Sequence, residues 1–267
     1  MKGLFGKPLC LIGAVHLLPL PGAADYGSSM DEIVDAAVAD ALIYKQQGFD
    51  ALVVENTHDA PYLKGYVAPE TVSAMTVAAR RLKEAVDLPL GVQLLAGANI
   101  EALAVAVACE LDFIRVEGFV FAHVGDEGIH EACAAELIRR RFNLRAGRVK
   151  IFADIKKKHS SHAITADVDI AETAIEAANF KADGVVVTGA RTGLPPLGHE
   201  VDAVRTSVDI PLLIGSGIDE DNIREFAPLA DALIIGSAAK IDGRWTSRVC
   251  PERAGRLVKA SRSLKTV

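Results

Sequence analysis

Two short glycine turns near the C-terminal end of the chain have the composition of a phosphate-binding site. Gly215-Ser216-Gly217 follows the apolar run 211–214, and Gly236-Ser237 follows the apolar run 232–235. Because glycine has no Cβ, its backbone N–H can approach an anion closely, and the two serine hydroxyls are further donors. One such turn could be only a tight connection. Two of them at the ends of successive strands predict a cradle for a phosphorylated ligand.

A candidate for proton transfer follows an earlier apolar run. Asp154 comes directly after the run 149–153. A carboxylate at the end of a buried strand should have a raised pKa because desolvation disfavours its charged form, which suits a general base. Lys158 and His159 follow closely and could polarise or protonate a substrate. Alternatively, Asp154 and a neighbouring lysine could form a buried ion pair that only orders the loop.

Two glutamates lie at comparable positions in the chain. Glu55 directly follows the run 51–54, and Glu117 directly follows the run 113–116. Side chains alternate along a strand, so Glu117 should lie on the same side as Arg115. The two carboxylates could pass protons to and from a substrate. They could also be the acid and base of an enzyme that cleaves a glycosyl bond, which requires a defined separation between them. The sequence leaves both roles open.

Further polar residues end or follow the remaining apolar runs, and we expect them to contact the substrate. They are His16, Asn56, Gln93, Arg115, Thr188 and Arg191. Arg191 could clamp a phosphate through two parallel hydrogen bonds, or it could pair with a surface carboxylate.

The sequence identifies no cofactor with certainty. His16, Glu55, Asp154 and His159 offer nitrogen and oxygen ligands that a divalent metal such as zinc, manganese or iron accepts, so a metal is possible. A lysine in the run 156–158 could instead form a Schiff base with a carbonyl substrate. Three consecutive lysines are, however, also typical of a solvated loop.

The elements that must position these residues are visible as eight apolar runs rich in valine, isoleucine and leucine. They lie at 9–15, 51–54, 90–95, 113–116, 149–153, 184–187, 211–214 and 232–235. Nearly continuous hydrophobicity indicates parallel strands that are covered on both faces. Helical patterns separate the runs, so the sequence predicts one α/β domain over residues 1–267, a single (β/α)8 TIM barrel. An open, doubly wound sheet is the alternative.

Helix start and stop signals support this alternation. Ser29-Met30-Asp31-Glu32 has the form of a capping box, with Ser29 and Glu32 three residues apart, and Gly48 is a typical helix end. Pro69-Glu70 places proline in a first turn and a carboxylate near the positive end of a helix.

Composition excludes several classes of protein. A net charge of -6 argues against nucleic-acid binding, which needs a basic face. No run of about 18 apolar residues is present, so we expect no integral membrane segment. The four cysteines lack metal-site spacing and are expected to be reduced thiols in a cytoplasmic protein. A homo-oligomer is possible, because apolar residues on the helices could form an interface.

These motifs together resemble the BtpA/SgcQ family of TIM-barrel proteins over essentially the whole chain. The matching stretches are Val54-Glu55-Asn56 continuing through His58-Asp59-Ala60-Pro61-Tyr62, Pro69-Glu70, Gly91-Val92-Gln93-Leu94-Leu95, Phe113-Ile114-Arg115-Val116, Asp154 with Lys158-His159-Ser160, Thr188-Gly189 with Thr192-Gly193, Gly215-Ser216-Gly217 with Asn222-Ile223, and Gly236-Ser237 with Lys240.

The resemblance implies a ribulose-phosphate-binding type of barrel. Members of the BtpA/SgcQ family are associated with photosystem I biogenesis at thylakoid membranes or with sugar-utilisation clusters. We therefore expect an enzyme that acts on a phosphorylated sugar or related metabolite, with an isomerase or epimerase type of proton transfer. The first alternative is a noncatalytic photosystem I biogenesis or assembly factor peripheral to membranes. The second is a lyase or an enzyme that cleaves a glycosyl bond.

Overall fold

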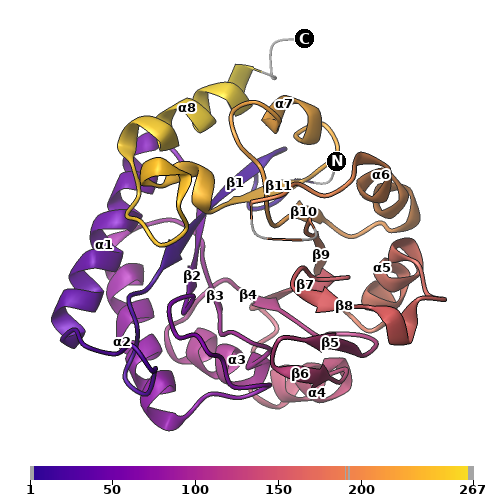
Figure 1. Cartoon of the computed structure of the whole chain (residues 1–267), viewed down its shortest axis with the longest axis horizontal. Helices are drawn as coiled ribbons and strands as arrows, with labels where there is room; N and C mark the ends of the chain where they lie inside the picture. The colour runs from indigo at the N-terminus through magenta and orange to yellow at the C-terminus, as the bar shows by residue number, and fades with distance from the viewer. Residues whose placement is uncertain (1–2, 190, 192, 264–267) are drawn as a thin grey trace.

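Eight parallel strands form a closed barrel at the centre of the molecule (Figure 1). The structure is a computed structural model, and it describes residues 3–189, 191 and 193–263. Around the barrel the strand order is β1-β11-β10-β9-β7-β4-β3-β2. The strands are β1 (Cys10–His16), β2 (Ala51–Glu55), β3 (Leu90–Gln93), β4 (Phe113–Val116), β7 (Lys150–Ile155), β9 (Gly184–Val187), β10 (Leu212–Ile214) and β11 (Ala232–Ile235). They coincide with the eight apolar runs, so the predicted TIM-barrel fold is confirmed.

Helices surround the barrel on its outer side (Figure 1). They are α1 (Met30–Gln47), α2 (Pro69–Ala85), α3 (Asn99–Ala108), α4 (Ala134–Asn143), α5 (Ile170–Asn179), α6 (Gly198–Ser207), α7 (Ile223–Phe226) and α8 (Pro251–Arg262). The predicted capping box of α1 is present: the Ser29 hydroxyl accepts the Glu32 N–H at 3.2 Å, and the Glu32 carboxylate accepts the Ser29 N–H at 2.7 Å. Gly48 ends α1 in the left-handed conformation, as expected.

Two aromatic rings fill much of the barrel interior. Phe113 on β4 and Phe152 on β7 are buried with their ring centroids 5.2 Å apart. Glycines on neighbouring strands leave room for them, because a Cβ on Gly91 would lie 2.2 Å from the Phe113 ring and one on Gly184 would lie 2.9 Å from the Phe152 ring. A larger apolar layer separates the outside of the barrel from the helices. The interior is therefore a packed core that closes the barrel below the strand ends.

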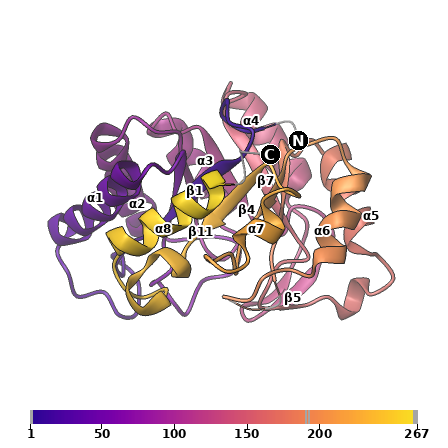
Figure 2. The same cartoon turned by 90° about the horizontal axis from the view of Figure 1, so that it is seen from above.

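Short elements extend the loops at the carboxyl ends of the strands. β5 (His123–Gly125), β6 (Gly128–His130) and β8 (Ser160–Ser161) form a three-stranded antiparallel sheet from the loops after β4 and β7. Figure 2 shows β5 at one end of the barrel, below β4 and β7. Three short 3-10 helices, η1 (Ala163–Thr165), η2 (Ser237–Ala239) and η3 (Ile241–Gly243), belong to the same set of loops. The sequence patterns did not predict these elements.

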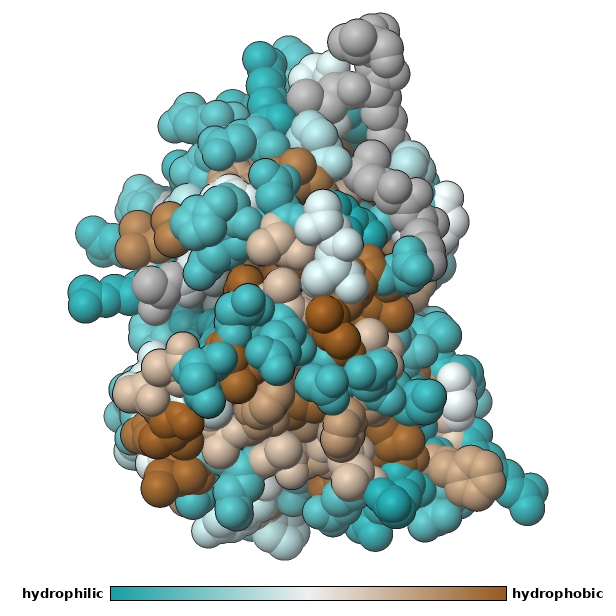
Figure 3. Space-filling model, turned by 90° about the vertical axis from the view of Figure 1, so that its right-hand side faces the viewer, coloured by the Kyte–Doolittle hydropathy of each residue, from teal (hydrophilic) through white to brown (hydrophobic). Residues whose placement is uncertain are grey.

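The outer surface mixes charged and apolar side chains. Figure 3 shows the side that carries α5 and α6, where apolar patches lie between hydrophilic ones. Ile175 and Phe180 of the α5 region are among the exposed apolar residues. Among the described residues, no helix combines the length and the apolar character needed to cross a bilayer. The homo-oligomer stays a prediction.

Replacing Gly91 by alanine should destabilise the barrel, because the new methyl group overlaps the Phe113 ring. Overpacking of this kind lowers the free energy of unfolding by about 1–3 kcal/mol. Urea unfolding monitored by circular dichroism measures it. Gly147→Ala is the matched control, since a Cβ there meets no atom within 4 Å. Equal stability of the two variants would contradict the packing described above.

Candidate active site

A cavity of about 480 Å³ lies at the carboxyl ends of the barrel strands. Its walls come from strand ends that are far apart in the chain, which meet because all eight strands are parallel. Most of the polar residues expected from the sequence line it: His16, Glu55, Gln93, Arg115, Glu117, Lys158, His159, Gly215, Ser216, Gly217, Gly236 and Ser237. Asn56, Asp154, Thr188 and Arg191 are not among the lining residues. The volume is in the range of small-molecule sites.

The first glycine turn, after β10, is built against the loop that follows β9. Gly217 has a φ of +72°, and a Cβ there would lie 2.0 Å from the Leu194 backbone. The Ser216 hydroxyl accepts the Gly189 N–H at 2.9 Å and donates to the Leu194 carbonyl at 3.3 Å. The Ser216 side chain therefore holds two loops together, and it is not the spare phosphate donor that we expected. In the part of the chain that the structure describes, the Gly217 N–H donates no hydrogen bond.

The second glycine turn, after β11, faces open space in the cavity. A Cβ on Gly236 would make only ordinary contacts, the nearest being 3.7 Å from His16 Nε2. Ser237 begins η2 and lines the cavity. None of the described residues forms a hydrogen bond with the Ser237 hydroxyl or accepts its N–H. The turn therefore orients the Ser237 hydroxyl and N–H but does not take them up in its own hydrogen bonds, as an anion site requires.

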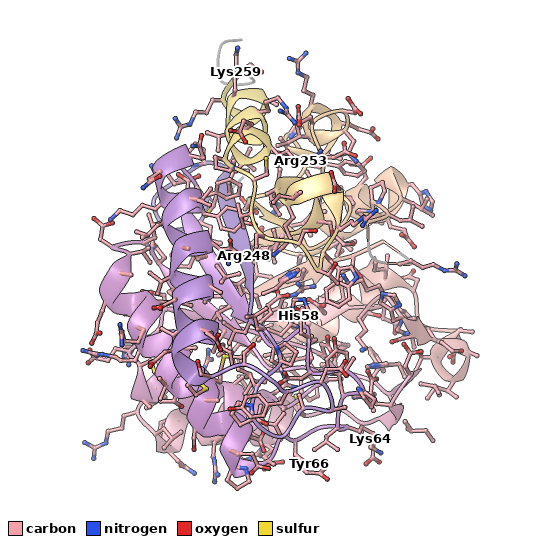
Figure 4. The ribbon with its side chains drawn as sticks, turned by 60° about the vertical axis from the view of Figure 1, so that its left-hand side comes forward. His58, Lys64, Tyr66, Arg248, Arg253 and Lys259 are labelled. Carbon is pink, nitrogen blue, oxygen red and sulfur yellow. The ribbon has the colours of Figure 1, made fainter. Side chains whose placement is uncertain are left out.

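Arg253 adds a positive charge to this side of the cavity and was missed by the sequence analysis. It lies in the first turn of α8, and its Nε donates to the Ala238 carbonyl at 2.8 Å, which fixes the guanidinium beside η2. Figure 4 shows Arg253 near the start of α8. A basic residue in a first helical turn opposes the helix dipole. That unfavourable placement is the signal in the sequence that could have identified it.

A buried arginine lines the cavity and is paired with an aspartate behind it. Arg115 donates from Nε to Asp154 Oδ1 and from Nη2 to Asp154 Oδ2, both at 2.9 Å. Its Nη1 lies 3.4 Å from Glu55 Oε1. Both Asp154 oxygens are thus occupied by a permanently charged partner, and the side chain lies outside the cavity. This arrangement does not fit the general base expected of Asp154, whose structural effect is to hold Arg115.

Glu55 and His16 form a facing pair of titratable groups. Burial raises the pKa of Glu55, although Arg115 and Lys158 oppose the shift. Burial lowers the pKa of His16 well below its usual range, and the nearby Lys240 lowers it further. His16 Nδ1 donates to the Trp245 carbonyl at 2.9 Å, so the neutral ring presents the lone pair of Nε2, which lies 3.7 Å from Glu55 Oε2.

Lys158 brings an amine into the same region. Burial and the positive charge of Arg115 lower the pKa of this lysine. In the described ranges no side chain or carbonyl pairs with its Nζ. The Lys158 backbone N–H donates to the Thr188 hydroxyl at 3.0 Å, so Thr188 positions the loop from outside the cavity. His159 is an exposed residue at the cavity, where partial desolvation and the positive charge of Lys158 lower its pKa.

Glu117 is held by neighbouring side chains. Gln93 Nε2 donates to one carboxylate oxygen at 3.0 Å, and Lys157 Nζ donates to the other at 3.2 Å. Glu55 and Glu117 are therefore not an equivalent pair, because only Glu55 has an oxygen near an unprotonated base. Lys157 was expected in a solvated loop, but it is buried in this ion pair. The contact explains why the lysine run is not uniformly exposed.

Two expected substrate contacts have other places in the structure. Asn56 Oδ1 accepts the Leu95 N–H at 2.8 Å, and Asn56 Nδ2 donates to Asp59 at 2.9 Å, so this side chain joins the loops after β2 and β3. Arg191 is exposed in the loop after β9. Among residues 3–189, 191 and 193–263, no group of three or more histidine, cysteine, aspartate or glutamate side chains is arranged to hold a metal ion.

Solved structures share the barrel with this chain. Thiamine phosphate pyrophosphorylase from Pyrococcus furiosus superposes with a TM-score of 0.59 over 96% of both chains, at 16% sequence identity. At that level of identity the likeness establishes the fold.

Sequence relatives cover nearly the whole chain. An uncharacterized mitochondrial protein of Caenorhabditis elegans is 42% identical and aligns with 97% of this chain and 95% of its own length. A Synechocystis protein named photosystem I biogenesis protein BtpA is 36% identical over 94% of this chain and 87% of its own. The BtpA family pattern matches residues 7–263. This protein, with its two glycine turns and its buried Arg115 at one cavity, belongs to the BtpA family.

Proposed function

We propose that the protein is an enzyme that binds a phosphorylated sugar or related metabolite and transfers a proton in an isomerase or epimerase type of reaction. One observation carries the proposal. A single cavity joins an anion cradle, made by Gly217, Ser237 and Arg253, to the titratable pair Glu55 and His16. The cradle would anchor the ligand, and the pair would act on its carbon skeleton.

The phosphate would lie between the turns after β10 and β11. The N–H groups of Gly217 and Ser237 are donors without an acceptor among the described residues, and the Ser237 hydroxyl is a third donor. The Arg253 guanidinium supplies positive charge, and its planar form suits phosphate oxygens. The fold neighbour from Pyrococcus furiosus is named for a phosphate-bearing compound, which agrees with this class of ligand.

The reaction would use Glu55 as the base. A carboxylate whose pKa is raised by burial is a better base near neutral pH than an ordinary one. It would remove a proton from a carbon next to a carbonyl group. Lys158 would polarise that carbonyl, and the fixed charge of Arg115 would stabilise the negative charge that develops. Asp154 would act on the reaction only by positioning Arg115.

The name of the Synechocystis relative favours a second candidate, a noncatalytic factor in photosystem I biogenesis. Such a role gives no reason for the half-buried Lys158 to lie among charged groups in a cavity. Placing a titratable group there is unfavourable for folding, and arrangements of this kind are concentrated at sites of chemistry. We therefore rank the enzyme first.

Inorganic phosphate should stabilise the fold, and Ser237→Asp should remove this effect because a carboxylate would repel the anion. At about 100 times its dissociation constant, a ligand of the native state adds about 2.7 kcal/mol to the free energy of unfolding. Urea unfolding with and without phosphate measures the effect. Ser73→Asp makes the same charge change on the exposed surface of α2 and should keep it. If both variants retain the stabilisation, the cradle is not the anion site.

Glu55→Gln should slow proton exchange at carbon by about 10²–10⁴-fold, the usual contribution of a general base. The assay incubates the protein in D2O with a panel of aldose and ketose phosphates and follows loss of carbon-bound hydrogen by NMR. Because the base works only when ionised and its pKa is raised, wild-type exchange should fall as the pH drops through a value above 4.5.

Glu84→Gln is the matched control, since Glu84 forms an exposed ion pair with Arg80 on α2. It should exchange at the wild-type rate. Exchange that persists unchanged in Glu55→Gln would assign the base to another residue.

A further inference from the structure

Trp245 lines the cavity from the loop after η3, which follows β11 in the chain. It is the single tryptophan of a chain in which aromatic residues are only 5% of the total. Trp245 is 38% exposed. An exposed tryptophan at the wall of a cavity has apolar surface to offer a ligand.

The Trp245 ring is held in place by contacts on both its backbone and its face. The Trp245 carbonyl accepts a hydrogen bond from His16 Nδ1. The His58 ring packs against the indole with centroids 5.0 Å apart and planes tilted by 36°. His58 is fixed in turn, because its Nδ1 lies 2.6 Å from the Leu17 carbonyl. His58 lies in the loop after β2 (Figure 4) and is not a lining residue. A rigid ring of this kind loses little entropy when a ligand stacks on it.

A second fixed ring lines the same cavity. The Tyr62 hydroxyl donates to the Thr57 carbonyl at 2.6 Å, which ties this ring to the loop after β2. Tyr62 and Trp245 are both lining residues. The cavity thus contains two immobilised aromatic surfaces in addition to its polar groups.

Hydrogen-bond acceptors also line the cavity, and one of them, Glu127, is held by His130 Nε2 at 3.2 Å. Asp126 and Glu127, from the turn between β5 and β6, line the cavity, as does Thr57. Carboxylates accept hydrogen bonds from amino groups and ring N–H groups. A flat ligand ring with donors at its edge therefore fits these surroundings better than a purely aliphatic chain does.

We propose that the phosphorylated ligand carries a planar heteroaromatic ring in addition to the carbonyl-bearing skeleton on which Glu55 would act, and that this ring stacks on Trp245; nucleoside monophosphates serve as probes of the ring and the phosphate. The inference rests on the proposed phosphate cradle and deepens it by naming the second half of the ligand. A cavity of about 480 Å³ accommodates a molecule of drug size, which leaves room beyond the phosphate and a sugar. Trp245 is then a specificity-determining residue, with no part in moving protons.

The test compares ligands that share a phosphate and differ in the ring. The four common ribonucleoside 5′-monophosphates, ribose 5-phosphate and inorganic phosphate are titrated into the full chain, followed by calorimetry and by the fluorescence of the single tryptophan. At least one nucleotide should bind more tightly than ribose 5-phosphate and quench the fluorescence. Trp245→Leu should weaken that nucleotide by about 5- to 100-fold, the effect of losing a base–aromatic stack, and change ribose 5-phosphate less than about 2-fold.

Trp245→Phe is the conservative variant and should recover most of the nucleotide affinity. The His16 bond uses the Trp245 backbone carbonyl, so neither substitution removes it; circular dichroism and urea unfolding verify that both variants fold. Equal affinities for nucleotides and ribose 5-phosphate, or equal weakening of both in Trp245→Leu, would overturn the ring proposal and leave the cradle standing. If none of the ligands binds, and phosphate gives no stabilisation, the cradle itself fails.

Discussion

The bidentate contact between Arg115 and Asp154 is the interaction on which the site depends. A buried guanidinium is tolerated only when it is paired and hydrogen-bonded, and Asp154 meets this need with two bonds of 2.9 Å. The fixed positive charge then acts on its neighbours: it opposes the raised pKa of Glu55 and contributes to the lowered pKa of Lys158. It also limits the first glycine turn, since a Cβ on Gly215 would lie 3.0 Å from Arg115 Nη2.

The fold could be predicted from the sequence because buried parallel strands are recognisable as continuous apolar runs. Each run, from 9–15 to 232–235, became one strand of the barrel. The sheet of β5, β6 and β8 could not be found in this way, because these short strands contain histidine, glycine and serine and do not form continuous apolar runs. Their pairing joins the loops after β4 and β7, which the sequence pattern does not show to be neighbours.

The sequence predicts where the candidate site lies in the barrel, but it does not predict which of its side chains pair with one another. Residues at strand ends, such as Glu55 and Arg115, had to meet at the cavity once the fold was known. Arg115 pairs with Asp154 because their strands, β4 and β7, are neighbours in the barrel. The two residues are 39 positions apart in the sequence, so the sequence alone does not indicate this pair. Arg253 and Trp245 follow the last strand and return to the cavity through η2, η3 and the start of α8. Neither residue lies at the end of a strand, so the search for polar residues at strand ends did not identify them.

In the proposed function, the groups that would anchor the ligand and the groups that would react with it come from different stretches of the chain. The cradle is built by the segments after β10 and β11 and by α8, whereas Glu55, His16 and Lys158 come from β1, β2 and the loop after β7. Under that proposal, substitutions in the first part would alter the chemistry while the last part would keep the ligand in place. If the proposed function holds, two BtpA family members can diverge in the reaction that they catalyse and still share one common phosphate-binding site.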